Sequence, residues 1–334
     1  YKKGTYNTIV SPNKLLRMNK NSKNNELRGI YDNVMLPNYS PANFIPKEAK
    51  GSRIWDLDNK EYIDFGGGIA VNSLGHSHPS LIRALSDQSQ KFWHLSNYLS
   101  NEPAINLAKQ ITDSTFAENV FLSNSGTEAN EAAIKIARKY HSSKGDQRSE
   151  LVSFKNSFHG RSLLNISLGS SEMHRNGFEP LMPGIKHGEF NNESNLEKLI
   201  SNNTAAVIVE PVQGEAGVFK ASNEFIKKLR EECSKKGTLL IIDEVQSGVG
   251  RMGTLYGYMQ YDIEPDIVTS AKGLGGGIPI GATLTTQSIG ECMQPGTHGS
   301  TFGGNPMACA VANEVLNIVN NKDFLNDVLE KEKL

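Results

Sequence analysis

Short apolar runs alternate with longer amphipathic segments over most of this chain, an order that is typical of an α/β domain. Three of the runs, AAVIVE, TLLIID and DIVTS, are almost continuously apolar, as parallel strands are when both of their faces are covered. Two further runs, NVFLS and LVSF, are also predicted to be strands. The pattern therefore predicts a parallel sheet that is covered on both faces.

Amphipathic spacing predicts helices between these strands. In the segment Thr127–His141, Ala133, Ile136, Ala137 and Tyr140 recur on one face, as they do in a helix with one buried side. The other predicted helices cover residues 80–95, 102–111 and 306–321. Nearer the N-terminus, glycine and proline punctuate shorter strand-like runs, and two of these runs flank Asp58-Asn59, which predicts a hairpin.

The two ends of the chain are expected to differ from its middle. Residues 1–17 carry four basic residues and no acid, but they lack the apolar core of a secretory signal, so we interpret them as a leader or tag before Met18. The polar run that follows extends the predicted disordered arm to cover residues 1–29. At the other end, a last helix reaches Leu334 without a terminating Gly or Pro, which predicts that residues 306–334 begin an unfinished C-terminal domain.

Composition and charge exclude several classes of partner. The 334 residues carry a formal net charge of −1, whereas nucleic-acid and membrane surfaces select a basic excess. No apolar run approaches the length of a membrane span. Cys233, Cys292 and Cys309 form neither a disulfide framework nor a metal pair, so we expect a reducing cytoplasm. His76 and His78 lack the further ligands that a metal site needs, and no metal is predicted.

Candidate chemistry lies where the predicted strands end. Lys272 follows DIVTS and Asp243 ends TLLIID, which places both at the edge where α/β sheets bind ligands. Taken singly, a solvated loop lysine and a buried structural carboxylate explain these residues equally well. A lysine amine can form a Schiff base with an aldehyde, however, and a desolvated aspartate can keep a pyridine nitrogen protonated.

Two turns supply the remaining parts of such a site. In SNSGTEANEAA, the backbone N–H groups of Ser125, Gly126 and Thr127 at a helix start suit a phosphate, although an ordinary capped helix has the same pattern. In KNSFHGRS, Phe158 can stack on a flat ring and Arg161 can bind a carboxylate, although a core phenylalanine and a surface arginine are the simpler interpretation.

Together these parts describe pyridoxal 5′-phosphate as the cofactor. The glycines that follow Lys272 are interpreted as giving the lysine the freedom to release the cofactor and return as a proton carrier.

The chain also resembles a known family. The segments SNSGTEAN, NSFHGRSL, VEPVQGEAG, IIDEVQSGVGRMG, SAKGLGGGIPIGA and HGSTFGGNP occur in the order found in class III, ornithine-type pyridoxal-phosphate aminotransferases of fold type I. GSRIWDLDNKEYIDFGGGIAVNSLGHSHP resembles the N-terminal signature of the bacterial acetylornithine branch. The resemblance implies a large domain over 76–305 with a mostly parallel sheet of seven strands, and a smaller α+β domain that begins over 30–75 and is incomplete here.

The resemblance also implies roles for single residues. Lys272 forms the Schiff base and Asp243 pairs with the ring nitrogen. The other implied cofactor contacts are Phe158 stacked on the ring, Gln246 near its phenolic oxygen, Ser125, Gly126 and Thr127 at the phosphate, and Ser300 and Thr301 at the phosphate of the neighbouring subunit. The implied substrate contacts are Arg161 at the α-carboxylate, the aromatic Tyr39, and Glu215 as a gate whose partner arginine would follow Leu334.

The implied reaction transfers the δ-amino group of N2-acetyl-L-ornithine to 2-oxoglutarate, within arginine biosynthesis and in a homodimer with shared active sites. Ornithine, succinylornithine, succinyl-diaminopimelate and 4-aminobutyrate remain open as donors. An aminomutase on the same fold would need no 2-oxoglutarate. A non-catalytic remnant is a third possibility, because the C-terminal domain is unfinished.

Overall fold

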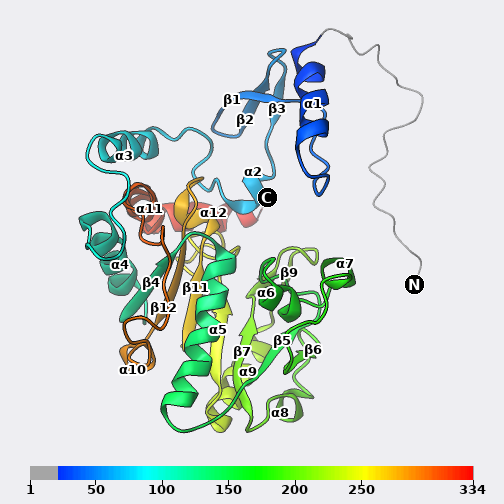
Figure 1. The fold of residues 1–334 in the computed structure, drawn as a ribbon, viewed down its shortest axis with the longest axis vertical. Helices are drawn as coiled ribbons and strands as arrows, with labels where there is room; N and C mark the ends of the chain where they lie inside the picture. Colours follow the sequence, from blue (N-terminus) through cyan, green and yellow to red (C-terminus); the bar gives the residue numbers. More distant parts are fainter. Residues whose placement is uncertain (1–21, 334) are drawn as a thin grey trace. The chain divides into compact units, whose positions relative to one another are not determined.

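The computed structural model describes residues 22–333, which form two compact units (Figure 1). The smaller unit runs up to Phe65 and includes Gly75–Ser77, and the larger unit contains Gly66–Leu74 and the residues from His78 onward. The division therefore differs from the expected boundary at residue 75. None of the helices within 22–333 combines the length and the apolar character that crossing a membrane requires. The predicted leader over 1–17 lies outside the described residues.

One helix and a three-stranded antiparallel sheet form the smaller unit. Their bounds are α1 Lys23–Val34, β1 Pro46–Lys50, β2 Arg53–Asp56 and β3 Glu61–Ile63, with β2 in the centre. The predicted hairpin is confirmed, because β2 and β3 pair antiparallel on either side of Asp58-Asn59. The Asp56 carboxylate closes the turn by accepting hydrogen bonds from the backbone N–H groups of Asp58 and Lys60, each at 2.9 Å. Asn59 adopts a left-handed φ of 62°, which asparagine tolerates.

The disordered arm predicted over residues 1–29 is wrong from Lys23 onward, because α1 begins there. The Ser22 hydroxyl caps this helix by accepting a hydrogen bond from the Asn25 backbone N–H. The buried Asn24 then fixes the helix to the sheet: its side chain donates to Asp58 and accepts from the Ile45 backbone N–H at 2.8 Å. The polar composition of this segment does not indicate these specific contacts.

A seven-stranded sheet forms the centre of the larger unit. Its order is β4 (Asn119–Ser123), β12 (Gly281–Thr285), β11 (Ile267–Ser270), β10 (Leu239–Asp243), β7 (Thr204–Val209), β5 (Glu150–Phe154) and β6 (Ile185–Gly188). β12 is antiparallel to both of its neighbours, and the strands from β11 to β6 are parallel. The prediction of a mostly parallel sheet is confirmed.

Helices cover both faces of this sheet (Figure 1). Alternate residues of one strand enter two separate apolar clusters: in β7, Ala206 and Ile208 join residues of α5 (Gly126–Ser143), whereas Val207 and Val209 join residues of α9 and α11. This two-sided burial explains the continuously apolar runs. The other described elements are α2 Gly67–Ala70, α3 Pro79–Ser89, α4 Glu102–Ser114, α6 Leu163–Leu168, α7 Glu172–Arg175, α8 Leu196–Leu199, β8 Val212–Gln213, β9 Phe219–Lys220, α9 Asn223–Lys236, η1 Gly257–Gln260, η2 Lys272–Gly275, α10 Gln287–Gly290, α11 Pro306–Val319 and α12 Lys322–Glu332.

The prediction of one helix and the domain assignment of another need correction. The helix expected over 80–95 ends at Ser89, where the buried Gln88 side chain donates to the Phe92 carbonyl at 2.9 Å and stabilises a turn instead. The helix expected at the start of a separate C-terminal domain is α11, which contacts α3 and α4 and contributes Val311 and Val315 to the core of the larger unit. Its burial therefore joins residues 306–319 to this unit.

Candidate active site

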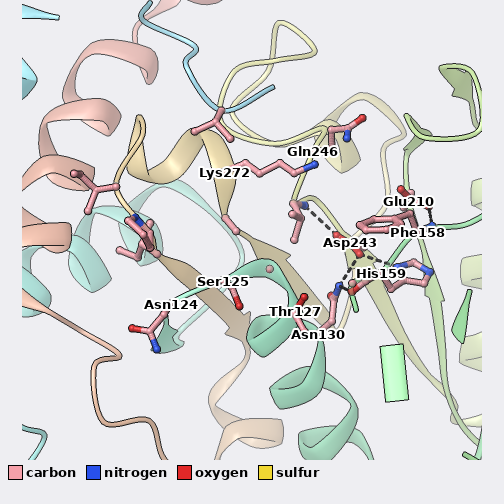
Figure 2. Close-up of a pocket in the computed structure, with 18 of the residues that line it drawn as sticks. Asn124, Ser125, Thr127, Asn130, Phe158, His159, Glu210, Asp243, Gln246 and Lys272 are labelled. Atoms are coloured by element: carbon pink, nitrogen blue, oxygen red, sulfur yellow. Dashed lines mark hydrogen bonds and ion pairs between the residues drawn. The ribbon is translucent and has the colours of Figure 1, made fainter. Parts of the chain in front are cut away.

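A cavity of about 300 Å³ lies at the carboxyl edge of the parallel strands (Figure 2). Its size suits a small-molecule ligand. The predicted site residues that line it are Ser125, Gly126, Thr127, Phe158, Asp243, Gln246 and Lys272. They come from segments that follow β4, β5, β10 and β11, so the folded sheet brings together residues that are far apart in the sequence.

Lys272 enters the cavity from the first position of η2, which is separated from the end of β11 by Ala271 alone (Figure 2). Burial lowers the pKa of its amine, whereas the charges of Glu215, Asp243 and Glu210 oppose that shift. A lowered pKa increases the fraction of neutral amine, which is the form that attacks a carbonyl. The backbone of Lys272 has a φ of 45°, a left-handed conformation that is uncommon for a residue other than glycine.

The glycines after Lys272, which were predicted to make the backbone mobile, also have a packing role. A Cβ atom on Gly276 would lie 2.7 Å from the Leu81 side chain, and one on Gly275 would lie 3.0 Å from Ile280. Gly276 also has a φ of 55°. These glycines therefore allow the turn to contact the core closely.

Asp243 is buried at the end of β10 and held by three donors (Figure 2). Its Oδ2 lies 2.8 Å from Asn130 Nδ2 and 2.7 Å from His159 Nδ1, and its Oδ1 accepts from the Val245 backbone N–H at 3.0 Å. Burial alone would lower the pKa of His159, but the hydrogen bond and charge of Asp243 raise it overall. The sequence interpretation missed Asn130 and His159 in these roles.

Glu210, which directly follows β7, is a second buried acid that lines the cavity. Its Oε2 accepts a hydrogen bond from the Phe158 backbone N–H at 3.0 Å, which fixes the segment that carries the Phe158 ring. Burial raises the pKa of Glu210 to about 8, although the positive charge of His159 opposes the shift. The carboxyl group therefore holds its proton at neutral pH.

We expect Glu210→Gln to remove a loss of stability that the wild-type protein undergoes as the pH rises. An acid whose pKa is higher in the folded than in the unfolded protein binds its proton more tightly when folded. The free energy of unfolding therefore falls between the ordinary pKa of 4.5 and about 8. Glutamine cannot ionise but can still accept from Phe158. Between about pH 5 and about pH 8, the free energy of unfolding of the variant should increase by on the order of 1–3 kcal/mol relative to that of wild type. Urea unfolding at both pH values measures this gain, and parallel pH dependences would contradict it.

The phosphate cradle was predicted at the turn from β4 to α5. Gly126 and Thr127 are the first residues of α5, so their N–H groups have no acceptor within the helix. The Ser125 hydroxyl, in contrast, is engaged by Glu128: it donates to Oε2 at 3.0 Å and accepts from the Glu128 backbone N–H at 3.2 Å. The two free backbone donors and the positive end of an 18-residue helix suit an anion.

Gly126 is required for this turn to approach the loop after β10. A Cβ atom at this position would lie 2.6 and 2.8 Å from the two methyl groups of Val245. We expect Gly126→Ala to weaken phosphate-cofactor binding about tenfold and to lower the free energy of unfolding by about 1–3 kcal/mol. Adding Val245→Ala removes the clash and should restore most of both quantities. Gly29→Ala, inside α1 and with no atom within 4 Å of its new Cβ, is the control: it should leave cofactor binding unchanged and should not lower the free energy of unfolding, because alanine favours a helix interior more than glycine does.

Polar groups border the ring of Phe158. The Arg161 guanidinium lies 5.4 Å from the centre of that ring, and the His174 ring lies edge-on to it at 5.9 Å. Glu215 accepts a hydrogen bond from Gln246 Nε2 at 3.2 Å. Arg161 and Glu215 do not line the cavity itself but contact two residues that do. His174 was not identified from the sequence.

Three further predicted residues do not line the cavity either. Ser300 accepts a hydrogen bond on its Oγ from Asn124 Nδ2 at 3.0 Å, and Thr301 beside it is exposed. Tyr39 belongs to the smaller unit, where 74 % of its surface is exposed. The roles of all three remain predictions.

The donor set fits a phosphorylated pyridine aldehyde. A partly buried amine, a buried carboxylate held by three donors, an aromatic ring and two backbone N–H groups surround one cavity. Within residues 22–333, no three His, Cys, Asp or Glu side chains come together to hold a metal ion.

Comparisons with known proteins agree with this geometry. The family model described as "Aminotransferase class-III" matches residues 34–334. A succinylornithine transaminase of Salmonella typhi is 55% identical over 302 residues, which cover 90% of this chain and 74% of that protein. A structure of the Toxoplasma gondii ornithine aminotransferase, described with partial occupancy of PLP at the active site, has a TM-score of 0.84 at 34% identity and covers 92% of this chain and 71% of that one. An N-acetylornithine aminotransferase structure from Stenotrophomonas maltophilia has a TM-score of 0.76 at 39% identity and covers 88% and 73% of the two chains.

Proposed function

This chain belongs to the class III aminotransferase family, and we propose that it transfers the δ-amino group of N2-acetyl-L-ornithine to 2-oxoglutarate. The products would be N-acetyl-L-glutamate 5-semialdehyde and glutamate. The joint placement of Lys272 and Asp243 in one cavity carries the chemical part of the proposal. Similarity to the Stenotrophomonas maltophilia N-acetylornithine aminotransferase supports the choice of donor.

N-succinylornithine is the second candidate donor. The relative that is named for this substrate is 55% identical to the chain. The N-acetylornithine aminotransferase of known structure is 39% identical. The two donors share the ornithine carbon chain and differ in the charge of the acyl group. The ratio of kcat/KM for the two substrates therefore decides between them.

Pyridoxal 5′-phosphate is the cofactor of this transaminase family. When bound, it supplies an aldehyde that reacts with amines and a protonated ring that takes up electrons. We assign its covalent attachment to Lys272, its ring nitrogen to Asp243, its ring face to Phe158 and its phosphate to Gly126 and Thr127. Gln246 lies in the same cavity and would contact the ring oxygen.

The residues of the chain then divide the work of proton transfer. Lys272 Nζ, whose pKa is lowered by burial, is the base that removes the proton from the amine-bearing carbon of the substrate. The Asp243 carboxylate, which is oriented by Asn130 and His159, would pair with the ring nitrogen of the cofactor and stabilise a proton on it. Arg161 binds the α-carboxylate and orients that carbon toward Lys272.

A second copy of the chain is proposed to complete the site. The segment 93–98 is joined to the loop of Ser300 and Thr301 by hydrogen bonds from Asn97 to the Ser300 carbonyl and from Asn305 to the Trp93 carbonyl. These two segments expose large apolar side chains: Trp93 is 66 % exposed, Tyr98 is 98 % exposed and Phe302 is 57 % exposed. An apolar surface of this kind is typical of an interface. In such a homodimer, Ser300 and Thr301 would contact the phosphate bound in the partner subunit.

We also place the enzyme in the cytoplasm and in arginine biosynthesis. All three cysteines are buried and unpaired, which agrees with a reducing compartment. The proposed reaction needs both an acylornithine and 2-oxoglutarate. This requirement distinguishes it from reactions of the other amino donors, from an aminomutase and from a non-catalytic remnant.

The test is a visible absorption spectrum of the cofactor-loaded protein, recorded before and after each acylornithine is added and again after 2-oxoglutarate. We expect the donor to convert the lysine-bound aldehyde form to the amine form and 2-oxoglutarate to reverse the change. A spectrum that ignores both acylornithines would refute the donor assignment. Failure of the folded protein to bind the cofactor through Lys272 would refute the catalytic assignment as well.

A further inference from the structure

His174 contacts the ring that forms one wall of the cavity. It is half-buried on α7, and its imidazole lies 5.9 Å from the centre of the Phe158 ring at an interplanar angle of 82°. The Arg161 guanidinium lies 5.4 Å from the centre of the same ring. One aromatic side chain is therefore bordered by a permanent cation and by a group that gains or loses a proton near neutral pH.

The charges around His174 come from three segments. Arg161 lies on the segment after β5, Glu215 lies between β8 and β9, and α7 itself contributes Glu172 and Arg175. The neighbouring α6, whose sequence is LLNISL, brings no titratable side chain. Burial and the charge of Arg161 lower the pKa of His174, whereas Glu215 opposes the shift. Without a ligand, these surroundings therefore disfavour the protonated imidazole.

A carboxylate bound at Arg161 would change this balance. It would neutralise the positive charge that disfavours protonation of His174 and would add a negative charge beside the imidazole. We propose that His174 is a positioning residue that holds the substrate carboxylate together with Arg161 and takes up a proton from solvent when that carboxylate binds. This inference rests on the proposed function, because the assignment of Arg161 to the carboxylate is part of it.

The direction of the pH effect follows from linkage. Because the ligand binds the protonated imidazole more tightly, carboxylate affinity should be highest at low pH and should fall as the pH rises through the range in which His174 loses its proton. A purely structural contact between His174 and Phe158 predicts no such dependence.

Calorimetry of the cofactor-loaded full chain tests the inference directly. The ligand is glutarate, a dicarboxylate without an amine or keto group, titrated at about pH 6.5 in two buffers that differ in their enthalpy of ionisation. The difference in measured heat between the buffers counts the protons taken up. We expect wild type to take up a substantial fraction of one proton per site and to bind glutarate about tenfold more weakly at about pH 8 than at about pH 6.

Three variants distinguish titration of His174 from a structural role of its side chain. His174→Phe keeps an aromatic ring against Phe158 but cannot titrate, and His174→Gln keeps a polar group. Both should lose the proton uptake and the pH dependence. Met173→Gln, at a neighbouring position that is 85 % exposed, should behave as wild type. Equal proton uptake in wild type and His174→Phe, or none in wild type, would overturn the proposal. His174-dependent uptake in a protein that transaminates neither acylornithine would uphold it while refuting the proposed donor.

Discussion

Replacing Lys272 with alanine is expected to lower kcat by at least about 10⁴-fold, the upper range for loss of a positioned acid–base group. In the proposed mechanism, the variant would lose both the amine that attaches the cofactor covalently and the base that removes the substrate proton. The surrounding charges remain, because Asp243 keeps its contacts with Asn130, His159 and Val245. Single-turnover absorbance with acylornithine measures the loss.

Two comparisons separate this chemical effect from a loss of fold. Lys272→Arg keeps the positive charge, but its guanidinium stays protonated, so it should be as inactive as the alanine variant. Methylamine added to Lys272→Ala supplies a free amine in the emptied space and should restore part of the proton transfer. An alanine variant that retains a tenth of the wild-type rate would show that Lys272 is not the base.

Asp243→Asn is expected to lower kcat by about 10²–10⁴-fold. Asparagine preserves the shape of the side chain but removes the negative charge. A loss of this size corresponds to about 3–5 kcal/mol of activation free energy, which we attribute to the missing negative charge opposite the ring nitrogen of the cofactor. The same substitution should lower the pKa of His159, because the hydrogen bond and charge of Asp243 are what raise it against the effect of burial. Kinetics measures the first effect, and the NMR titration of His159 measures the second.

Asp266→Asn is the matched control for this substitution. Asp266 immediately precedes β11, and its Oδ2 accepts hydrogen bonds from Arg230 at 2.7 Å and from the Leu240 backbone N–H at 2.6 Å. Its loss should reduce stability and leave kcat unchanged. Equal kinetic losses in the two variants would mean that Asp243 acts through the fold alone.

Residues at the ends of apolar strands were the most predictable part of the site. Asp243 and Lys272 were both found because a polar residue after a continuously buried strand marks the ligand-binding edge of a parallel sheet. The same signal was available for Glu210, which ends AAVIVE, and it was missed. Asn130 stands three positions after Thr127 on α5, but only its distance to Asp243 distinguishes it from an ordinary helix residue.

Other features of the structure could not be predicted from the local sequence pattern. His174 lies on a four-residue helix whose sequence predicts no contact with Phe158. The start of α1 at Lys23 depends on a side-chain cap and on the contacts of Asn24 with the hairpin, so a polar composition alone suggested disorder. Compositional arguments do not detect such hydrogen bonds because they are specific to one arrangement of the backbone.

By itself, the sequence determined the alternation of strands and helices, the two-sided burial of the sheet, and the residue types that stand at its carboxyl edge. These follow from periodicity and burial, which neighbouring residues set locally. Only the tertiary structure decided which polar groups meet. Asp243 is joined to Asn130 and His159 across 113 and 84 positions of the chain. Contacts over such separations depend on how independently formed elements pack, and local patterning does not specify that packing.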